Sequence, residues 1–190
     1  MAETIKTGYL INKVPYKVFD EIISFIDKTG TIYNCMSLGS KRITSKNGRQ
    51  LFYATPIEFE IFQSRFDNKL SKLKKAHALE EIDWKIETNK ALILLNEIII
   101  KSKITTKEFF TFYKNMLKII KENKYSVDVI RLIIMWRFLE LNAAQVDFEQ
   151  YESNNVLNNL QLLESGKYNK IESDIPQTFK FLKNYIKIIL

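Results

Sequence analysis

Hydrophobic and polar residues alternate along the first part of the chain in a way that predicts β-strands. Three segments of high β-propensity follow one another at 5–14, 18–27 and 31–39. The sequence Asp27-Lys28-Thr29-Gly30 predicts a turn between the second and the third. We therefore expect these segments to form a three-stranded meander.

A fourth strand is predicted over 51–62, where apolar residues occupy alternate positions and Pro56 indicates a bulge or a sheet edge. The segment 69–79 fits two structures. Its residues Leu70, Leu73 and Ala76 have a helical spacing, whereas a closed five-stranded barrel needs a strand there. Four or five short strands within about 80 residues are typical of a small barrel such as an OB-fold.

From Trp84 onward the periodicity becomes helical. A first helix is predicted over 86–102. A second begins at a capping box of Thr105 and Glu108 and runs to about 123, and a third begins at a Ser126 cap and runs to Leu141. The third of these has little polar face, which predicts a central position. A last helix begins at Asp174 and Pro176, with four apolar residues facing inward: Phe179, Leu182, Ile186 and Ile189. A hairpin is a candidate at 164–167.

The pattern therefore predicts an α+β protein with two domains. An OB-fold β-barrel covers residues 1–80, and an all-helical domain, a candidate for partner binding, covers residues 81–190. The beginning of the chain has no apolar signal region, and no apolar stretch is long enough to span a membrane, so we expect a soluble protein that stays inside the cell.

Charge is concentrated in one predicted loop. The chain carries a net charge of +7, and the run Gly39-Ser40-Lys41-Arg42-Ile43-Thr44-Ser45-Lys46-Asn47-Gly48-Arg49 contains four cations and no acid. This loop between the third and fourth strands fits two roles: an ordinary solvated loop, or a surface that contacts phosphates and releases counterions. Lysines and arginines in the second role give sequence-neutral, salt-sensitive binding.

Three aromatic residues near this loop also fit two roles. Tyr33, Phe52 and Tyr53 either pack in the core or at a sheet edge, or stack on bases as aromatic residues of OB-folds do. No constellation of residues supports catalysis. The single histidine, His77, has no second histidine or cysteine to form a metal site or a nucleophile pair, and no phosphate-cradling glycine loop occurs. We expect a protein that is not an enzyme.

The order of short motifs along the first half of the chain resembles a known family. These motifs are Thr7-Gly8-Tyr9-Leu10-Ile11, Tyr16, Asp20-Glu21-Ile22-Ile23, Thr29-Gly30, and Gly39-Ser40-Lys41-Arg42 with Ser45-Lys46. Their succession, followed by Ile57-Glu58-Phe59 and a helical region, resembles the N-terminal OB domain of the RecO recombination mediators. The resemblance covers about 140 residues.

The resemblance implies a role in DNA repair and homologous recombination. Members of the family bind single- and double-stranded DNA, anneal complementary strands without ATP, and help load RecA together with RecR and the single-strand-binding protein, in the RecFOR pathway. It places the protein in the cytoplasm, at the nucleoid. The candidate DNA-binding residues are Lys13, Lys17, Lys41, Arg42, Lys46 and Arg49.

The family also receives the acidic, hydrophobic tail of single-strand-binding protein on its helical domain. Candidate clamps for carboxylates of that tail are Lys114, Arg131 and Arg137, and ordinary surface charge is the alternative.

The sequence departs from the family pattern in two respects. Many members carry a four-cysteine zinc module, at a place that corresponds to 151–170 here, but Cys35 is the single cysteine of this chain. We expect no zinc and no other cofactor. The chain also ends soon after Pro176, so the resemblance predicts a short member of the family.

Two other classes of function remain open from the sequence. OB barrels also bind RNA, so an RNA-binding or ribosome-associated protein is the main alternative. In a third interpretation the barrel is a scaffold, the helical domain binds other proteins, and nucleic acid does not bind at all.

Overall fold

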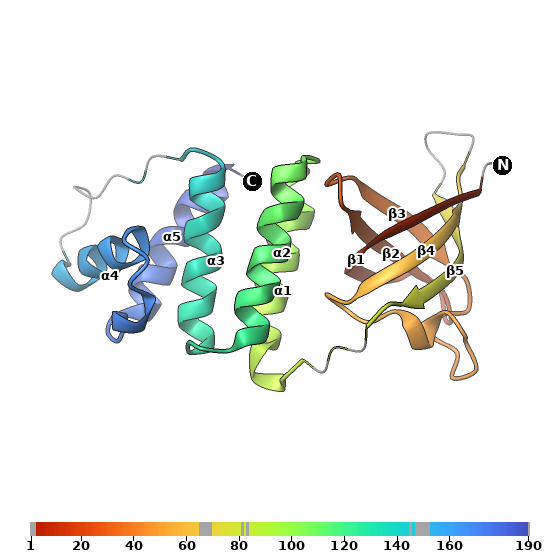
Figure 1. Ribbon diagram of the computed structural model, residues 1–190, viewed down its shortest axis with the longest axis horizontal. Helices are drawn as coiled ribbons and strands as arrows, with labels where there is room; N and C mark the ends of the chain where they lie inside the picture. Colours follow the sequence, from red (N-terminus) through yellow and green to blue (C-terminus); the bar gives the residue numbers. More distant parts are fainter. Residues whose placement is uncertain are drawn as a thin grey trace. The chain divides into compact units, whose positions relative to one another are not determined.

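The computed structural model describes residues 3–64, 70–80, 82, 84–144, 146 and 153–189. Contacts divide the chain into two compact units, which are described separately below (Figure 1). The first unit combines Met1–Asp83 with Lys103–Thr111, and the second combines Trp84–Ser102 with Phe112–Leu190. Residue 81, at the predicted domain boundary, lies outside the described residues.

Five strands of the first unit close into a barrel (Figure 1). They are β1 (Glu3–Pro15), β2 (Glu21–Asp27), β3 (Ile32–Ser37), β4 (Pro56–Phe62) and β5 (Ser71–Ala78). The order around the barrel is β1-β2-β3-β5-β4, and β4 pairs with β1 to close it. Neighbouring strands are antiparallel except for β3 and β5, which are parallel. The predicted OB-fold barrel is confirmed.

The first strand pairs with both β2 and β4 because it bends at a β-bulge. Leu10 lies opposite Phe25 and Asn12 lies opposite Ser24, so Ile11 is an extra residue in β1. An extra residue bends the strand and increases its twist, as closure of a small barrel requires. Both Leu10 and Ile11 are buried.

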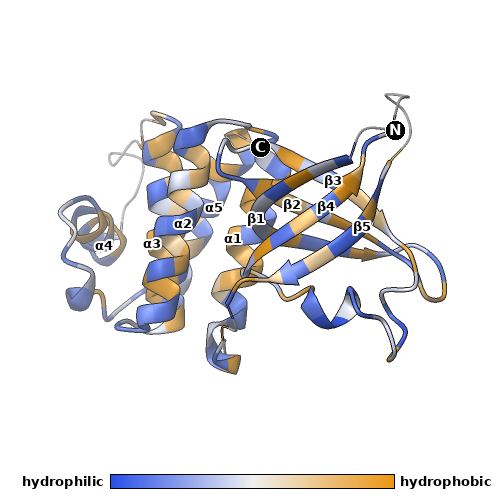
Figure 2. Ribbon diagram, turned by 45° about the vertical axis from the view of Figure 1, so that its right-hand side comes forward, coloured by the Kyte–Doolittle hydropathy of each residue, from blue (hydrophilic) through white to orange (hydrophobic). Residues whose placement is uncertain are grey.

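Apolar side chains fill the barrel interior. The rings of Phe25 and Phe59 stack near its centre, with 4.1 Å between centroids and 8° between planes. Hydrophobic and hydrophilic residues alternate along β4 (Figure 2), as expected for a strand with one buried face. The buried residues of this core are Leu10, Ile23, Phe25, Cys35, Leu51, Ile57, Phe59, Ile61, Leu73 and Ala76.

The ambiguous segment 69–79 contains the fifth strand, and a bulge explains its helical spacing. Lys75 lies opposite Glu60 and Leu73 lies opposite Ile61, so Lys74 is an extra residue in β5. The extra residue shifts the inward-facing positions by one. Leu73 and Ala76 are therefore both buried although they are three residues apart.

Two strands begin later than the sequence predicted. Ahead of β2, the amides of Tyr16 and Lys17 both donate to the Asp20 carbonyl, at 3.0 and 3.4 Å, and form a tight turn. Ahead of β4, Ala54 has a φ of 56° and donates its N–H to Leu10 O at 3.0 Å, so the chain turns there. Pro56 is the first residue of β4, a position where its missing donor is tolerated.

The predicted turn at Asp27–Gly30 is present and packs closely against a later segment. Gly30 has a φ of 85°, and a Cβ there would lie 2.0 Å from the carbonyl oxygen of Thr106. Only glycine fits both the backbone conformation and the space. The segment Lys103–Thr111, which includes the beginning of the second helix, is accordingly part of the barrel unit.

The second unit is helical. Its α-helices are α1 (Asn89–Ser102), α2 (Lys107–Glu122), α3 (Val127–Leu141), α4 (Asn154–Glu164) and α5 (Ile175–Ile189). The described part also has two 3-10 turns, η2 (Ile86–Thr88) and η4 (Tyr168–Lys170). Ser126 caps α3 as predicted, by accepting the N–H of Val129. Helix α3 is buried along most of its length, which confirms its central position in this unit.

Three local predictions for the helices were wrong. Thr106, not Thr105, caps α2, because its Oγ1 accepts the Phe109 N–H at 3.3 Å. The candidate hairpin at 164–167 is instead the end of α4, where Gly166 takes a φ of 70° after the last helical turn. In α5, Phe181 is buried with Leu182 and Ile186, whereas Phe179 is half-buried. No helix in the described ranges is long and apolar enough to cross a membrane.

Candidate nucleic-acid interface

The basic segment Gly39–Arg49 is the loop between β3 and β4, as the sequence predicted, and it is attached to the β1–β2 turn. The Gly39 amide donates to the Asp20 carboxylate at 2.8 Å. The Lys41 amide donates to the Phe19 carbonyl at 3.1 Å. These two bonds hold the start of the basic loop beside the β1–β2 turn at one end of the barrel.

The second half of the loop is attached to β5. It contains the short helix η1 (Gly48–Gln50), and the side chains of Asn47 and Gln50 accept the amides of Ala76 and Ala78, at 3.1 and 2.9 Å. A Cβ at Gly48 would lie 2.0 Å from Ser40 O, so glycine allows the two halves of the loop to approach. The loop therefore has a fixed conformation, which lowers the entropy cost of binding.

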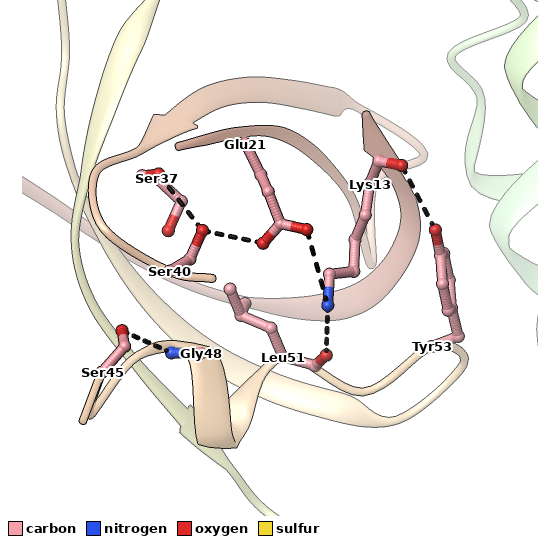
Figure 3. Close-up of polar contacts among 8 residues, drawn as sticks. All are labelled: Lys13, Glu21, Ser37, Ser40, Ser45, Gly48, Leu51 and Tyr53. Atoms are coloured by element: carbon pink, nitrogen blue, oxygen red, sulfur yellow. Dashed lines mark hydrogen bonds and ion pairs between the residues drawn. The ribbon is translucent and has the colours of Figure 1, made fainter. Parts of the chain in front are cut away.

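A buried carboxylate lies beneath the loop. Glu21, on β2, accepts the Ser40 hydroxyl at 2.7 Å and lies 4.0 Å from the Lys13 ammonium (Figure 3). Lys13 also donates to Leu51 O at 3.4 Å. Ser40 Oγ additionally lies 3.2 Å from Ser37 O. This cluster links β1, β2 and both ends of the β3–β4 connection, and it gives Lys13 a structural role.

The cations of the candidate interface differ in how they are held. Lys17, Lys41 and Lys46 are exposed. The Arg42 guanidinium lies over the Phe19 ring, 4.9 Å from the centroid. Arg49 donates Nε and Nη2 to Ile43 O, at 3.3 and 3.1 Å, and so closes the loop on itself.

The exposed cations of this surface keep their charge available. Among the described residues, no acidic side chain forms an ion pair with Lys17, Lys41, Arg42, Lys46 or Arg49. Unpaired lysines and arginines on one rigid loop produce a local positive potential that attracts phosphates. The surface can therefore bind a nucleic acid through the phosphates of the nucleic-acid backbone.

The three predicted aromatic residues lie in different environments. Tyr33 is partly buried and packs against the barrel core: its ring lies edge-on to Phe59, with 5.8 Å between centroids, and its hydroxyl donates to Asp27. Burial and the Asp27 charge raise the pKa of Tyr33. Phe52 and Tyr53 are exposed next to the basic loop. The Tyr53 hydroxyl reaches the Lys13 carbonyl, at 3.5 Å (Figure 3).

Sequence reasoning missed two aromatic residues of the same surface. Tyr16 and Phe19 are exposed in the β1–β2 turn, beside the start of the basic loop. The prediction placed Phe19 in a strand that began at residue 18, and it used Tyr16 only as part of the family resemblance. A local signal was present, since Lys17 and Val18 separate the two aromatic residues and Asp20 can close the turn. The position of the turn beside the basic loop, however, depends on the pairing of β2 with β3.

A groove in the helical unit combines an apolar floor with a basic rim. It lies between α1, α3 and α5 and has a volume of about 380 Å³. Ile98, Met135 and Ile186 line it, and its charged lining residues are Lys90, Glu97, Lys101, Arg131, Lys183 and Lys187, so that cations predominate. Such a lining suits an acidic peptide with apolar side chains.

Of the three predicted carboxylate clamps, Arg131 lines this groove. Its guanidinium lies over Phe179, 4.2 Å from the centroid, and pairs with Asp128 at 3.0 Å. Its Nε is buried and makes no hydrogen bond to any described residue. Lys114 and Arg137 are not among the lining residues.

Arg137 already has two partners. It donates to Glu140 and to the Tyr168 hydroxyl, each at 2.7 Å. Burial lowers the pKa of Arg137, but its electrostatic interactions and hydrogen bonds with Tyr168 and Glu140 outweigh this and raise it. No group of three or more His, Cys, Asp or Glu residues in the described part of the chain is arranged to hold a metal ion.

Comparison with known proteins supports the resemblance seen in the sequence. The barrel and the helices that follow define a class of protein with an N-terminal OB-fold and a C-terminal helical region. The chain is similar to "DNA repair protein RecO" of Mycoplasma mycoides subsp. mycoides SC, with 27% identity over 157 residues. It is also similar to "DNA repair protein RecO" of Mycoplasma capricolum subsp. capricolum, with 23% identity over 154 residues. This is a RecO-like protein.

The similarity covers most of this chain but less of the two relatives. The aligned parts are 79% and 77% of this chain, and 62% and 61% of the relatives. The chain thus spans about three fifths of the length of the curated proteins it matches. No family model matches it.

Proposed function

We propose that this protein acts in DNA repair and that it binds DNA through the basic loop Gly39–Arg49 at the end of its OB-fold barrel. One observation carries the proposal: the loop presents cations that make no ion pair with any described acid, and hydrogen bonds to Asp20 and β5 hold it in place. Similarity to two proteins named as DNA repair proteins RecO supports the choice of DNA.

Binding by this surface is expected to be independent of sequence. The cations sit on a loop that carries no acid and are suited to phosphate oxygens, which are the same in every nucleotide. Each phosphate contact releases a condensed counterion, so the affinity should fall steeply as salt increases. The same surface suits single-stranded and duplex DNA, because both present a line of phosphates.

The test is a salt titration of DNA affinity for the triple variant Lys41→Ala, Arg42→Ala and Lys46→Ala. We expect weaker binding and a slope of log K against log salt that is shallower by about 2, at about 0.7 per lost contact on a single strand. Arg49 is left in place because it shapes the loop.

A matched control removes the same charge elsewhere. Lys167, Lys170 and Lys180 are exposed in the helical unit, and their replacement by Ala gives the same net charge. The control should keep the wild-type slope. Equal effects of the two triple variants would mean that net charge and not the loop determines binding, and unchanged binding of the loop variant would remove the loop from the interface.

We also propose that the protein is a mediator and not an enzyme. In this role DNA lies on the barrel, and RecR and the single-strand-binding protein bind to the helical unit, so that complementary strands anneal without ATP or RecA is loaded. The cytoplasm at the nucleoid is the expected location. The basic groove lined by Arg131 is the candidate contact for the acidic tail of the single-strand-binding protein.

An annealing assay tests the mediator role. Two complementary oligonucleotides coated with the cognate single-strand-binding protein are mixed with and without this protein, in the absence of ATP. Faster annealing supports the mediator role. If an Arg131→Ala variant still binds bare strands but no longer accelerates annealing, the groove is the contact for the single-strand-binding protein. If bare RNA displaces single-stranded DNA from the protein at equimolar amounts, an RNA-binding function replaces the proposed DNA-binding function.

A further inference from the structure

Two exposed phenylalanines lie in the two segments that form the candidate interface. Phe19, in the β1–β2 turn, is 46% exposed, and Phe52, just after the basic loop, is 53% exposed. Neither ring belongs to the buried barrel core, so both rings are accessible to a ligand.

The backbone around each ring is fixed by contacts in the barrel unit. The Phe19 carbonyl accepts the Lys41 amide, and the next residue, Asp20, accepts the Gly39 amide. Leu51, the residue before Phe52, is buried in the barrel core, and its carbonyl accepts a hydrogen bond from the Lys13 ammonium. The backbone that carries each ring is therefore held in place and does not need to be ordered on binding.

The charge around the rings identifies the kind of ligand. Residues 13–19 and 39–53 contain no acid, and the acids that follow the turn, Asp20 and Glu21, are occupied by bonds to Gly39, Ser40 and Lys13. Arg42 lies against the Phe19 ring, and Lys17 is two residues away. Apolar rings among unpaired cations match a strand that has both phosphates and flat, exposed bases.

We propose that Phe19 and Phe52 form a stacking surface for unpaired bases, so that this end of the barrel binds single-stranded DNA more tightly than duplex. The proposal rests on the DNA-binding function given above and names the form of DNA it prefers. In a duplex the base faces are already stacked on one another and cannot meet the rings. Duplex binding would then depend on the cations alone, whereas single strands gain the stacking interaction in addition.

The test compares the affinities of a double variant for a single strand and for a duplex of the same sequence. Phe19→Leu with Phe52→Leu keeps apolar side chains and removes both rings. Stacking on one base contributes about 1–3 kcal/mol, so we expect affinity for the single strand to fall about tenfold or more. Affinity for the duplex should stay within about twofold, and the salt slope should not change because the phosphate contacts remain.

Two further measurements separate stacking from a structural effect. Ile5→Ala is the control, since Ile5 is an exposed apolar residue of β1 outside both segments, and it should leave both affinities unchanged. A 2-aminopurine base in the single strand should change its emission on binding to the wild type and much less on binding to the double variant.

The possible outcomes distinguish this proposal from the function on which it rests. Equal losses for single strand and duplex, or no loss for either, would overturn the stacking surface. If the rings have no effect while the Lys41, Arg42 and Lys46 variant still loses affinity, DNA binding by the basic loop stands and only the stacking surface fails. If the wild type binds neither form of DNA, both proposals fail.

Discussion

The ammonium of Lys13 donates a hydrogen bond to the Leu51 carbonyl at 3.4 Å, and this bond joins β1 to a residue 38 positions later in the chain. The same ammonium lies 4.0 Å from the buried carboxylate of Glu21. Because both contacts are within the barrel unit, Lys13 contributes to the position of the segment that leads from the basic loop into β4.

Replacing Lys13 by Met should therefore destabilise the barrel. The change leaves Leu51 O without this donor and Glu21 without its cation, and we expect a cost of about 1–2 kcal/mol in unfolding free energy. Lys17→Met is the control, because Lys17 is exposed, and it should cost close to nothing. Urea denaturation measures both. Equal stabilities of the two variants would show that Lys13 has no structural role.

Arg49 should act on DNA through the shape of the loop. Its guanidinium donates two hydrogen bonds to Ile43 O. Lysine keeps the charge but cannot form this planar fork, so Arg49→Lys should weaken DNA binding by a few fold without flattening the salt slope. A direct phosphate contact made by charge alone would instead be preserved in the lysine variant, and affinity would not change.

Asp27 should make the stability of the barrel depend on pH. Burial raises the pKa of Asp27, but hydrogen bonds from Thr29, Thr31 and Tyr33 outweigh it, and the net pKa lies below the usual value. The stabilisation is therefore present above the unfolded-state pKa and is lost as the pH falls through the folded-state pKa. Asp27→Asn should lower stability at pH 7 by about 1 kcal/mol and flatten its decline in acid, as measured by thermal unfolding between pH 2 and 7.

Gly30→Ala should destabilise the barrel unit strongly. The new Cβ would lie 2.0 Å from the Thr106 carbonyl oxygen, at a φ of 85°. Gly39→Ala is a matched control in the same unit, with a φ of 65° but a nearest contact of 3.7 Å to the flexible Arg42 side chain. The control should cost about 1 kcal/mol, from backbone strain alone, and Gly30→Ala clearly more. Similar melting temperatures for the two variants would contradict the close packing.

Cys35 should be unreactive in the folded protein. Burial raises the pKa of its thiol to about 12, and the side chain is fully covered in the barrel core. The thiolate is the reactive form, so iodoacetamide at pH 8 should label Cys35 only as fast as the barrel opens. Mass spectrometry follows the labelling in the absence and presence of urea. Rapid labelling without denaturant would mean that the β3 region of the core is open.

The sequence alone determined the elements whose signals are local. High β-propensity and alternation of apolar residues identified β1 to β4, although β2 and β4 begin later than predicted. The cap at Ser126 together with a nearly all-apolar face identified α3 and its central position. The basic loop was also evident, because its composition does not depend on where the chain folds.

Tertiary structure decided what depends on residues distant in sequence. The inward spacing of Leu73 and Ala76 looks helical, and only pairing with β4 produces the bulge at Lys74 that makes it a strand. Phe19 lies beside the basic loop because antiparallel pairing of β2 with β3 brings Asp20 to Gly39, 19 residues later. Such contacts depend on how one strand pairs with another that is distant in the sequence, so no local pattern of residues could specify them.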